Sequence, residues 1–261
     1  MIVFVFIICL AASTIGGICG IGGGVVIKPL LDATGIMSVT TLSFLSGLTV
    51  LAMAVVNVWK NRKSKAIDLK RSLPLGIGAA IGGVLGKQLF QSLKAAVGSD
   101  QLVGLAQSIV LAILVAGTLL YVRNKSRIIT RSIQCPWLCA LVGAALGVLS
   151  SFLGIGGGPM NLAVLYYFFS MDTKQAAINS ILVILLSQLA SLGMTLCSGT
   201  VPPFDWAMLI AMAAAGIMGG FLSAKLQSKL PAKKVDVLFT LLLIVILFIC
   251  AFNGLKAAGV L

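Results

Sequence analysis

Histidine and glutamate are both missing from this chain, and its six acidic residues are all aspartates. Six cysteines are present, but none forms a Cys-x-x-Cys pair, so the residue pattern of a structural zinc site is absent. The sequence also lacks an apparent pair of nucleophile and general base. We therefore expect no catalytic residue, no metal site and no cofactor, and we expect that the protein is not an enzyme.

Polar segments long enough to fold as a soluble domain are missing too. Hydrophobic residues make up 59% of the 261 residues, charged residues make up 10%, and the mean hydropathy is +1.13. This composition predicts an all-α polytopic membrane protein whose partner is the lipid bilayer. The apolar segments expected to form its helices are 2–18, 24–36, 39–59, 73–93, 101–122, 136–152, 158–171, 176–197, 206–224 and 235–253. The second and seventh are short for a membrane span.

The excess of basic residues gives a net charge of +13, a value that can indicate a nucleic-acid partner. Their placement argues against that interpretation, because most of the Lys and Arg residues lie in three short loops between apolar segments. They are Lys60, Arg62, Lys63, Lys65, Lys70 and Arg71, then Arg123, Lys125, Arg127 and Arg131, then Lys225, Lys229, Lys233 and Lys234. Such loops are typical of the cytoplasmic side of a membrane protein. We predict that loops 60–72, 123–134 and 225–234 are cytoplasmic and that no nucleic acid is bound.

The five residues Gly-Ile-Gly-Gly-Gly occur twice, at 20–24 and at 154–158, and the same offset of 134 residues relates further identical pairs. These are Leu31 and Leu165, Met37 and Met171, Ser46 and Ser180, Gly82 and Gly216, and Gly86 and Gly220. The basic loops make segment 39–59 run from outside to inside and its counterpart 176–197 run the other way. We therefore predict two inverted repeats, 1–134 and 135–261, within a single integral membrane domain, an arrangement typical of transporters.

Each repeat is predicted to open with a helical hairpin that is broken at its glycine motif. Broken backbone at membrane depth is tolerated where it is buried in protein or lines a wet cavity. Pro159 follows the second motif, and proline is favoured in the first turn of a helix. Two helix N-termini would then point N–H groups and positive dipole ends at one central cavity, which suits an anion. The sequence leaves open whether each pair crosses the membrane twice or forms a re-entrant hairpin, which the short second members favour.

The candidate substrate-binding residues lie at the two breaks and on the segments that follow them. They are Gly20, Gly22, Gly23, Gly24, Lys28, Ser43, Ser46, Gly154, Gly156, Gly157, Gly158, Pro159, Asn161, Asn179 and Ser180. Lys28 would neutralise an anion, with pairing to Asp32 or snorkelling as alternatives. The serines and asparagines would donate hydrogen bonds to substrate oxygens or bond between helices. For the glycines the alternative is close packing, the interpretation we prefer for Gly78, Gly82 and Gly86.

Three stretches and the repeated layout carry a family resemblance over nearly the whole chain. The stretches are GICGIGGGVVIKPLL at 17–31, FLGIGGGPMNLAVL at 152–165 and KQAAINSILVILLSQLASL at 174–192. They resemble the sulfite exporter TauE/SafE family of bacterial and archaeal membrane proteins. Carried over residue by residue, the family motif covers Gly20 to Gly24 with Pro29, Gly154 to Pro159, and Asn179 with Ser180. The first copy departs at Val25, where the second copy has Pro159, so the helix start in the first repeat lacks its proline.

The resemblance implies transport of small sulfur-containing or organic anions, such as sulfite, sulfoacetate and related sulfonates, across the inner membrane of a prokaryotic cell. We expect an exporter that moves its substrate by alternating access around the two breaks. The alternatives are a channel-like anion pathway, a membrane sulfur-transfer protein that uses Cys19, and a metal-ion carrier. A proton relay would have to use Asp32, Asp172, Lys28 or the substrate itself. The exact substrate, the coupling ion and a homo-oligomeric state are left open.

Overall fold

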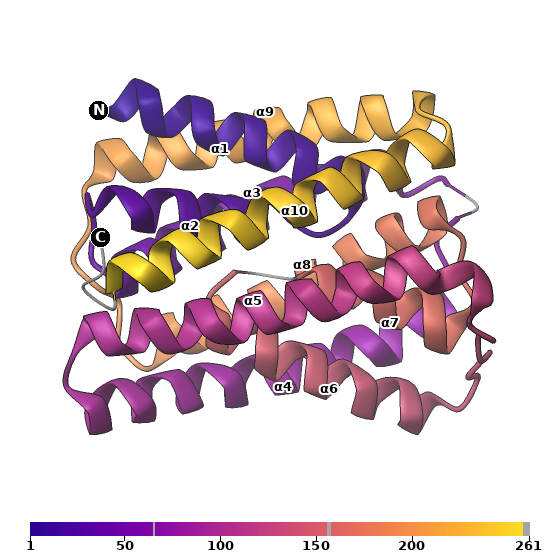
Figure 1. Cartoon of the computed structure of the whole chain (residues 1–261), viewed down its shortest axis with the longest axis horizontal. Coiled ribbons are helices and arrows are strands. Elements are labelled where there is room, and N and C mark those ends of the chain that lie inside the picture. Colours follow the sequence, from indigo (N-terminus) through magenta and orange to yellow (C-terminus); the bar gives the residue numbers. More distant parts are fainter. Residues whose placement is uncertain (65, 156–157, 258–261) are drawn as a thin grey trace.

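The computed structural model describes residues 1–64, 66–155 and 158–257, and this part of the chain is helical, without strands (Figure 1). The helices are α1 (Ile2–Cys19), α2 (Gly24–Thr34), α3 (Val39–Asn61), α4 (Leu69–Val97), α5 (Asp100–Asn124), the 3-10 turn η1 (Lys125–Arg127), α6 (Pro136–Leu153), α7 (Pro159–Phe169), α8 (Thr173–Cys197), α9 (Trp206–Lys229) and α10 (Ala232–Ala257). The predicted all-α class is therefore confirmed for the described residues.

Eight of these helices are long and apolar enough to cross a membrane: α1, α3, α4, α5, α6, α8, α9 and α10. The predicted multi-pass membrane protein is confirmed at this level. The helices α2 and α7 have 11 residues each, which corresponds to a length of about 16 Å. Each of these short helices follows one of the two glycine motifs.

Polar side chains define where several helices begin. A side-chain oxygen of the residue before the helix accepts a hydrogen bond from a backbone N–H in the first turn at Ser38, Asp68, Ser99, Asp172 and Asp205. Asp172 therefore caps α8, where it accepts from the backbone nitrogen of Gln175 at 2.9 Å. This role lies at a helix end and away from the glycine breaks, in contrast to the proton-relay role considered for Asp172.

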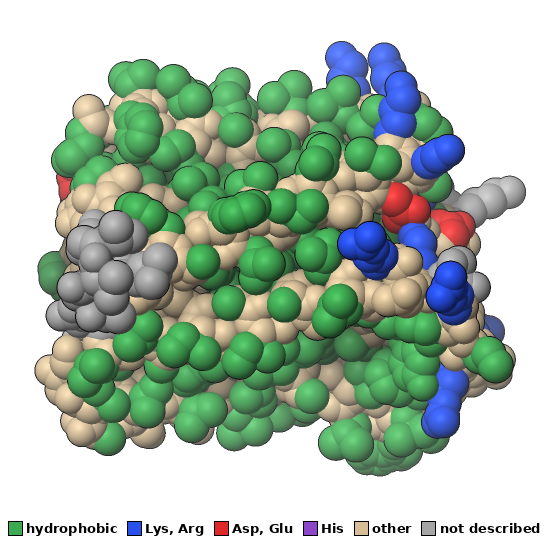
Figure 2. Space-filling view, in the orientation of Figure 1, with side chains coloured by type: hydrophobic (Ala, Val, Ile, Leu, Met, Phe, Trp, Pro, Cys, Tyr) green, Lys and Arg blue, Asp and Glu red, His purple; other side chains and the backbone are tan. Residues whose placement is uncertain are grey.

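The three basic segments meet at one end of the molecule, which we call the basic end and define by residues 60–72, 123–134 and 225–234. Arg71 donates to Ser132 Oγ at 3.1 Å, and Lys125 pairs with Asp236 at 2.8 Å. On the face shown in Figure 2 the Lys and Arg side chains gather at this end. The loops themselves are shorter than predicted, because α4 begins at Leu69 and α9 continues to Lys229. Lys and Arg are good helix formers, so the helices extend past their apolar parts.

The helices α1 and α2 form a hairpin that starts and ends away from the basic end (Figure 1). Helix α1 runs alongside α9, where Gly219 lies against Ser13 and Gln227 Nε2 donates to Ile18 O at 3.1 Å. Helix α2 then turns back, and its Pro29 O accepts from Asn253 Nδ2, near the C-terminal end of α10, at 2.9 Å. The glycine motif at 20–24 therefore lies in the interior of the bundle.

The helices α6 and α7 form a second hairpin, which starts and ends at the basic end. The carbonyl groups of Tyr167 and Phe168, at the end of α7, accept from the backbone nitrogens of Arg131 and Ile133 at 2.7 and 2.9 Å. Residues 131 and 133 lie directly before α6. The two hairpins thus enter the bundle from opposite ends, whereas the inverted repeat as a whole stays a prediction.

Helices α4 and α6 approach each other closely at three glycines of α4. A Cβ atom on Gly78, Gly82 or Gly86 would overlap the carbonyl oxygen of Ala140, Ala144 or Val148 on α6. Gly143 and Gly147 of α6 meet the backbone of α4 in the same way. The packing interpretation of Gly78, Gly82 and Gly86 is confirmed, because small residues let the two backbones come together.

Gly82→Leu is expected to lower the Tm of the purified protein in detergent. A Cβ at this position lies only 2.7 Å from the carbonyl carbon of Ala144, so α4 and α6 must separate, at a cost of about 1–3 kcal/mol or more. The matched control is Gly193→Leu in α8, because no atom of neighbouring elements in the described part of the chain lies within 4 Å of a Cβ there. Equal losses of Tm in the two variants would show that close packing at Gly82 is not what the glycine provides.

Candidate functional site at the two helix breaks

The first break begins where α1 ends at Gly20. Gly20 and Gly22 both have φ of +78°, a left-handed conformation that glycine adopts without strain. The backbone nitrogens of Ile21 and Gly22 turn back to donate to Gly16 O at 3.0 and 3.2 Å. Helix α2 then begins at Gly24, which is the predicted start of its apolar segment, although no proline stands there.

The second break has the same local form. Helix α6 ends at Gly154, with φ of +64°, and the backbone nitrogen of Ile155 donates to Ser150 O at 3.3 Å. Gly158 is extended, and Pro159 is the first residue of α7, as the sequence predicted. The candidate residues Gly156 and Gly157 lie outside the described residues.

The two breaks lie against each other in the interior of the protein. A Cβ on Gly24, at the start of α2, would overlap the carbonyl oxygen of Ile155 in the second break. A Cβ on Gly154 would lie 2.7 Å from Ser43 Oγ and 3.1 Å from Lys28 Nζ. Gly23 packs similarly against Ser13 of α1. Seven of the candidate residues therefore come together in one cluster, which consists of Gly22, Gly23, Gly24, Lys28, Ser43, Ser46 and Gly154.

Lys28 connects the two halves of this cluster. Its side chain is only 5% exposed, so it does not snorkel to an interface. Its Nζ donates to Leu153 O at the C-terminal end of α6 and to Gln107 Oε1 of α5, the latter at 2.7 Å. Gln107 Nε2 donates in turn to Phe152 O at 2.5 Å. A cation at this position stabilises the negative end of the α6 dipole.

The serines on the third and eighth helices have different surroundings. Ser46 Oγ donates to Gly154 O at 3.2 Å and so holds the second break, whereas Ser43 Oγ donates to Val39 O in its own helix at 2.7 Å. Ser180 is completely buried, and its hydroxyl has no hydrogen-bond partner among the described residues. Its neighbour Ala177 lies against Gly20 of the first break.

Two small cavities lie beside the breaks, each with a volume of about 20 Å³. Polar side chains of Lys28, Asp32, Gln107, Ser108 and Asn253 line one of them. The other is lined by apolar side chains together with Ser150, Gly158, Pro159 and Asn161. A volume of this size holds about one water molecule, so the site must widen before it can hold a larger anion.

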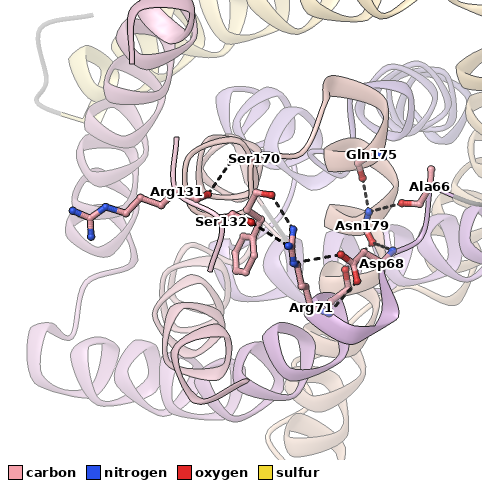
Figure 3. A network of polar contacts seen from close by, with 10 residues as sticks. Ala66, Asp68, Arg71, Arg131, Ser132, Ser170, Gln175 and Asn179 are labelled. Carbon is pink, nitrogen blue, oxygen red and sulfur yellow. Dashed lines mark hydrogen bonds and ion pairs between the residues drawn. The ribbon is translucent and has the colours of Figure 1, made fainter. Parts of the chain in front are cut away.

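Asn179 lies apart from the breaks, in the polar network at the basic end that Figure 3 shows. Its Oδ1 accepts from the backbone nitrogen of Asp68 at 2.9 Å and from Ser72 Oγ at 2.7 Å. Its Nδ2 donates to Ala66 O at 2.8 Å and to Gln175 O at 2.7 Å. All four hydrogen-bonding positions of the amide are used, so in this conformation Asn179 joins the segment before α4 to α8.

Asn179→Leu is expected to increase tryptic cleavage after Arg62 and Lys63 several-fold. The substitution removes the hydrogen bonds that hold residues 66 and 68, each with a net value of about 1 kcal/mol. Limited proteolysis followed by mass spectrometry would measure the rate, with cleavage in segment 225–234 of the same sample as the internal control. An unchanged rate at residues 62–63 would show that Asn179 does not restrain this segment.

The sequence analysis did not identify two amide side chains that lie beside the cluster: Gln107 on α5 and Asn253 on α10. Both are buried, and Asn253 Nδ2 donates to Pro29 O in α2. A polar side chain within an apolar span is costly and therefore often functional, and this signal would have identified both. They contact the first hairpin, since Gln107 bonds Lys28 and Asn253 bonds Pro29.

Comparison with known proteins agrees with this architecture. The family model "Sulfite exporter TauE/SafE" matches residues 5–249. The "Probable membrane transporter protein YunE" of Bacillus subtilis (strain 168) is 26% identical over 269 aligned residues, which cover 94% of this chain and 95% of the relative. No solved structure matches the chain significantly. The chain therefore belongs to the sulfite exporter TauE/SafE family of membrane transporters, which is not a family of enzymes.

Proposed function

We propose that this transporter moves a small sulfur-containing or organic anion, such as sulfite or a sulfonate, by alternating access around the point where its two helix breaks meet. The observation that best supports this proposal is the direct contact between the two breaks, in which Gly24 lies against Ile155 and Lys28 is hydrogen-bonded to the end of α6. Two buried helix breaks with a lysine between them suit an anion that must be bound and then released.

Local contacts related by the 134-residue offset support the inverted repeat. Gly16 O accepts from Ile21 N in the first half, and Ser150 O accepts from Ile155 N in the second. Gly154 lies against Ser43, and Gly20 lies against Ala177, which is the residue that the offset relates to Ser43. Under this proposal residues 1–134 and 135–261 are the two halves that move relative to each other.

The chemistry of the site differs between the halves. Lys28 of α2 has Leu162 as its counterpart in α7, so the cluster has a single buried cation. The start of α2 at Gly24 and the start of α7 at Pro159 add the positive ends of two helix dipoles. Asn161 and Ser180, whose hydroxyl has no hydrogen-bond partner among the described residues, are the donors available to substrate oxygens. A bound anion would replace Leu153 O as a partner of Lys28 Nζ.

We further propose that the basic end faces the cytoplasm of a prokaryotic cell and that the anion is exported from there. The positive-inside rule supports this orientation. A cavity of about 450 Å³ opens at the basic end beside Asn179, and Lys70 and Arg71 are among its lining residues. Such a cavity suits the arrival of an anion from the cytoplasm.

Transport by reconstituted protein tests the proposal. Liposomes loaded with unlabelled sulfite, sulfoacetate, taurine, lactate or chloride would receive a radiolabelled tracer of the same anion outside. For a carrier we expect one oxyanion to accelerate tracer entry from the opposite side and to raise the Tm of the purified protein. Tracer entry without such acceleration would indicate a channel instead. The absence of both transport and thermal stabilisation for every anion would contradict the proposed substrate class.

A further inference from the structure

A long apolar groove runs between α5 and α7 toward the basic end. Its volume is about 550 Å³, within the range of about 300–1,000 Å³ that is usual for small-molecule sites. The lining side chains are those of Ile113, Leu114, Thr118, Tyr121, Ile128, Met160, Ala163, Val164, Tyr167 and Phe168, with Gly117 between them. Ile113 at its rim is 65% exposed, so the groove opens on the lipid-facing surface of the bundle.

Gly117 keeps the groove open. It lies in the middle of α5, where glycine costs about 1 kcal/mol relative to alanine. No atom of the described residues in neighbouring elements lies within 4 Å of a Cβ at this position, so close helix packing does not require the glycine. The space that a side chain of residue 117 would fill is the space of the groove itself.

The lining chemistry suits an acyl chain and does not suit the transported anion. Apart from Thr118, whose hydroxyl donates to Leu114 O in its own helix, and the two tyrosines, the walls are apolar. Leu114 and Met160 also line the small cavity at the second break, so the groove reaches from the basic end to the start of α7. An occupant of the groove would therefore contact both α5 and α7.

Three exposed arginines lie next to groove-lining residues in the chain, at the basic end: Arg123 follows Tyr121 by two residues, Arg127 precedes Ile128, and Arg131 lies in the segment that joins α5 to α6. The backbone of Arg131 is joined to Tyr167 O of the groove wall, and its guanidinium points away from the polar network (Figure 3). Among the described residues none of these three arginines forms an ion pair, whereas Arg71 and Lys125 at the same end do. The three arginines are therefore placed to bind an anionic group from outside the chain.

Tyr121 provides a further polar atom at the same end of the groove. Its ring packs edge to face against Tyr167, with ring centroids 6.3 Å apart. Its hydroxyl is shielded from solvent and has no hydrogen-bond partner among the described residues. A buried hydroxyl without a partner is costly, and Tyr121 would have to turn its hydroxyl into the groove before a phosphate or ester oxygen of a lipid could accept its hydrogen bond.

We infer that an anionic phospholipid binds here, with one acyl chain in the groove between α5 and α7 and its phosphate at Arg123, Arg127 and Arg131. The bound lipid would fill the space that otherwise lets α7 move relative to α5. It would therefore stabilise one conformation of the second helix break, and transport would depend on the lipid composition of the membrane. The binding itself is independent of which anion is transported.

Native mass spectrometry of the purified full-length protein tests this site. Phosphatidylglycerol and phosphatidylcholine with identical acyl chains would be titrated separately, and glycerol 3-phosphate would be the headgroup control without chains. We expect tighter binding of phosphatidylglycerol than of phosphatidylcholine and no binding of glycerol 3-phosphate. The double variant Arg127→Gln with Arg131→Gln is expected to weaken phosphatidylglycerol binding about fivefold per arginine. The control is the double variant Lys225→Gln with Lys229→Gln, which removes the same amount of charge away from the groove.

Gly117→Leu fills the groove and is expected to abolish the preference for phosphatidylglycerol, whereas Gly193→Leu, in a comparably open position on α8, should leave it unchanged. Equal affinities for the two lipids in the unmodified protein would overturn the inference. So would an undiminished preference in both Gly117→Leu and the double arginine variant. If glycerol 3-phosphate bound as tightly as the whole lipid, the arginines would bind a soluble phosphate and the acyl chain would not occupy the groove, which would also overturn the inference.

Discussion

Gly24→Ala is expected to abolish transport and to lower the Tm of the protein, although it adds only one methyl group. The added Cβ would overlap Ile155 O and would lie 3.0 Å from a methyl carbon of Val50. Because the first contact is with backbone, the second break must move away from α2, at a cost of about 1–3 kcal/mol. A shift of this kind also separates the two helix N-termini that we propose to share the anion. Tracer exchange in liposomes and thermal unfolding would measure the two effects.

The matched control is Gly158→Ala, the same substitution at the position that the 134-residue offset relates to Gly24. Gly158 is extended, a conformation open to any residue, and among the described residues the nearest atom to its Cβ is a methyl carbon of Ile155 at 3.6 Å. Alanine should therefore be tolerated there, with transport close to that of the unmodified protein. If both variants were equally active, close contact of the breaks would not be required; if both were inactive, the motif would need glycine for another reason.

Much of the fold follows from hydropathy and from local backbone chemistry. Each of the ten predicted apolar segments coincides with one helix for most of its length. The reason is that an apolar segment in lipid must form all of its backbone hydrogen bonds within the protein. The start of α7 at Pro159 was predictable because proline suits the first helical turn. Helix ends were predicted less well, as α4 shows, because hydropathy marks where the membrane ends while helices continue through Lys70 and Lys94.

Contacts between distant segments could not be predicted from the sequence. Lys28 and Leu153 are 125 residues apart, and Lys28 and Gln107 are 79 apart, so only the folded bundle shows that the lysine lies at the end of α6. Asn179 was also predicted to lie beside the breaks, because it follows the second glycine motif along the chain. On α8 it lies about 200° around the helix from Ala177, which contacts Gly20, and it therefore faces the segment before α4.

Lys28→Met is the second substitution for which we expect a large effect, namely loss of transport together with a clear decrease in Tm. Methionine has a similar shape but donates no hydrogen bond, so Leu153 O and Gln107 Oε1 would each lose their buried donor. Each unsatisfied group costs about 1–3 kcal/mol. The control is Lys87→Met on α4, where the lysine lies over the ring of Phe90 at 5.7 Å and outside the cluster, and we expect only a small change there.

A double variant separates the structural role of Lys28 from its proposed role in binding the anion. Gln107→Leu combined with Lys28→Met removes both partners of one hydrogen bond, so its loss of stability should be smaller than the sum of the two single losses. Phe152 O loses its donor in the double variant, so the Tm should stay near that of Lys28→Met alone. Transport should remain absent, because the cluster then has no buried cation to bind the anion, and transport that returned would show that Lys28 acts only by holding α6. Transport that stays absent in a variant still folded at the assay temperature is the result that distinguishes a substrate-binding lysine from a structural one.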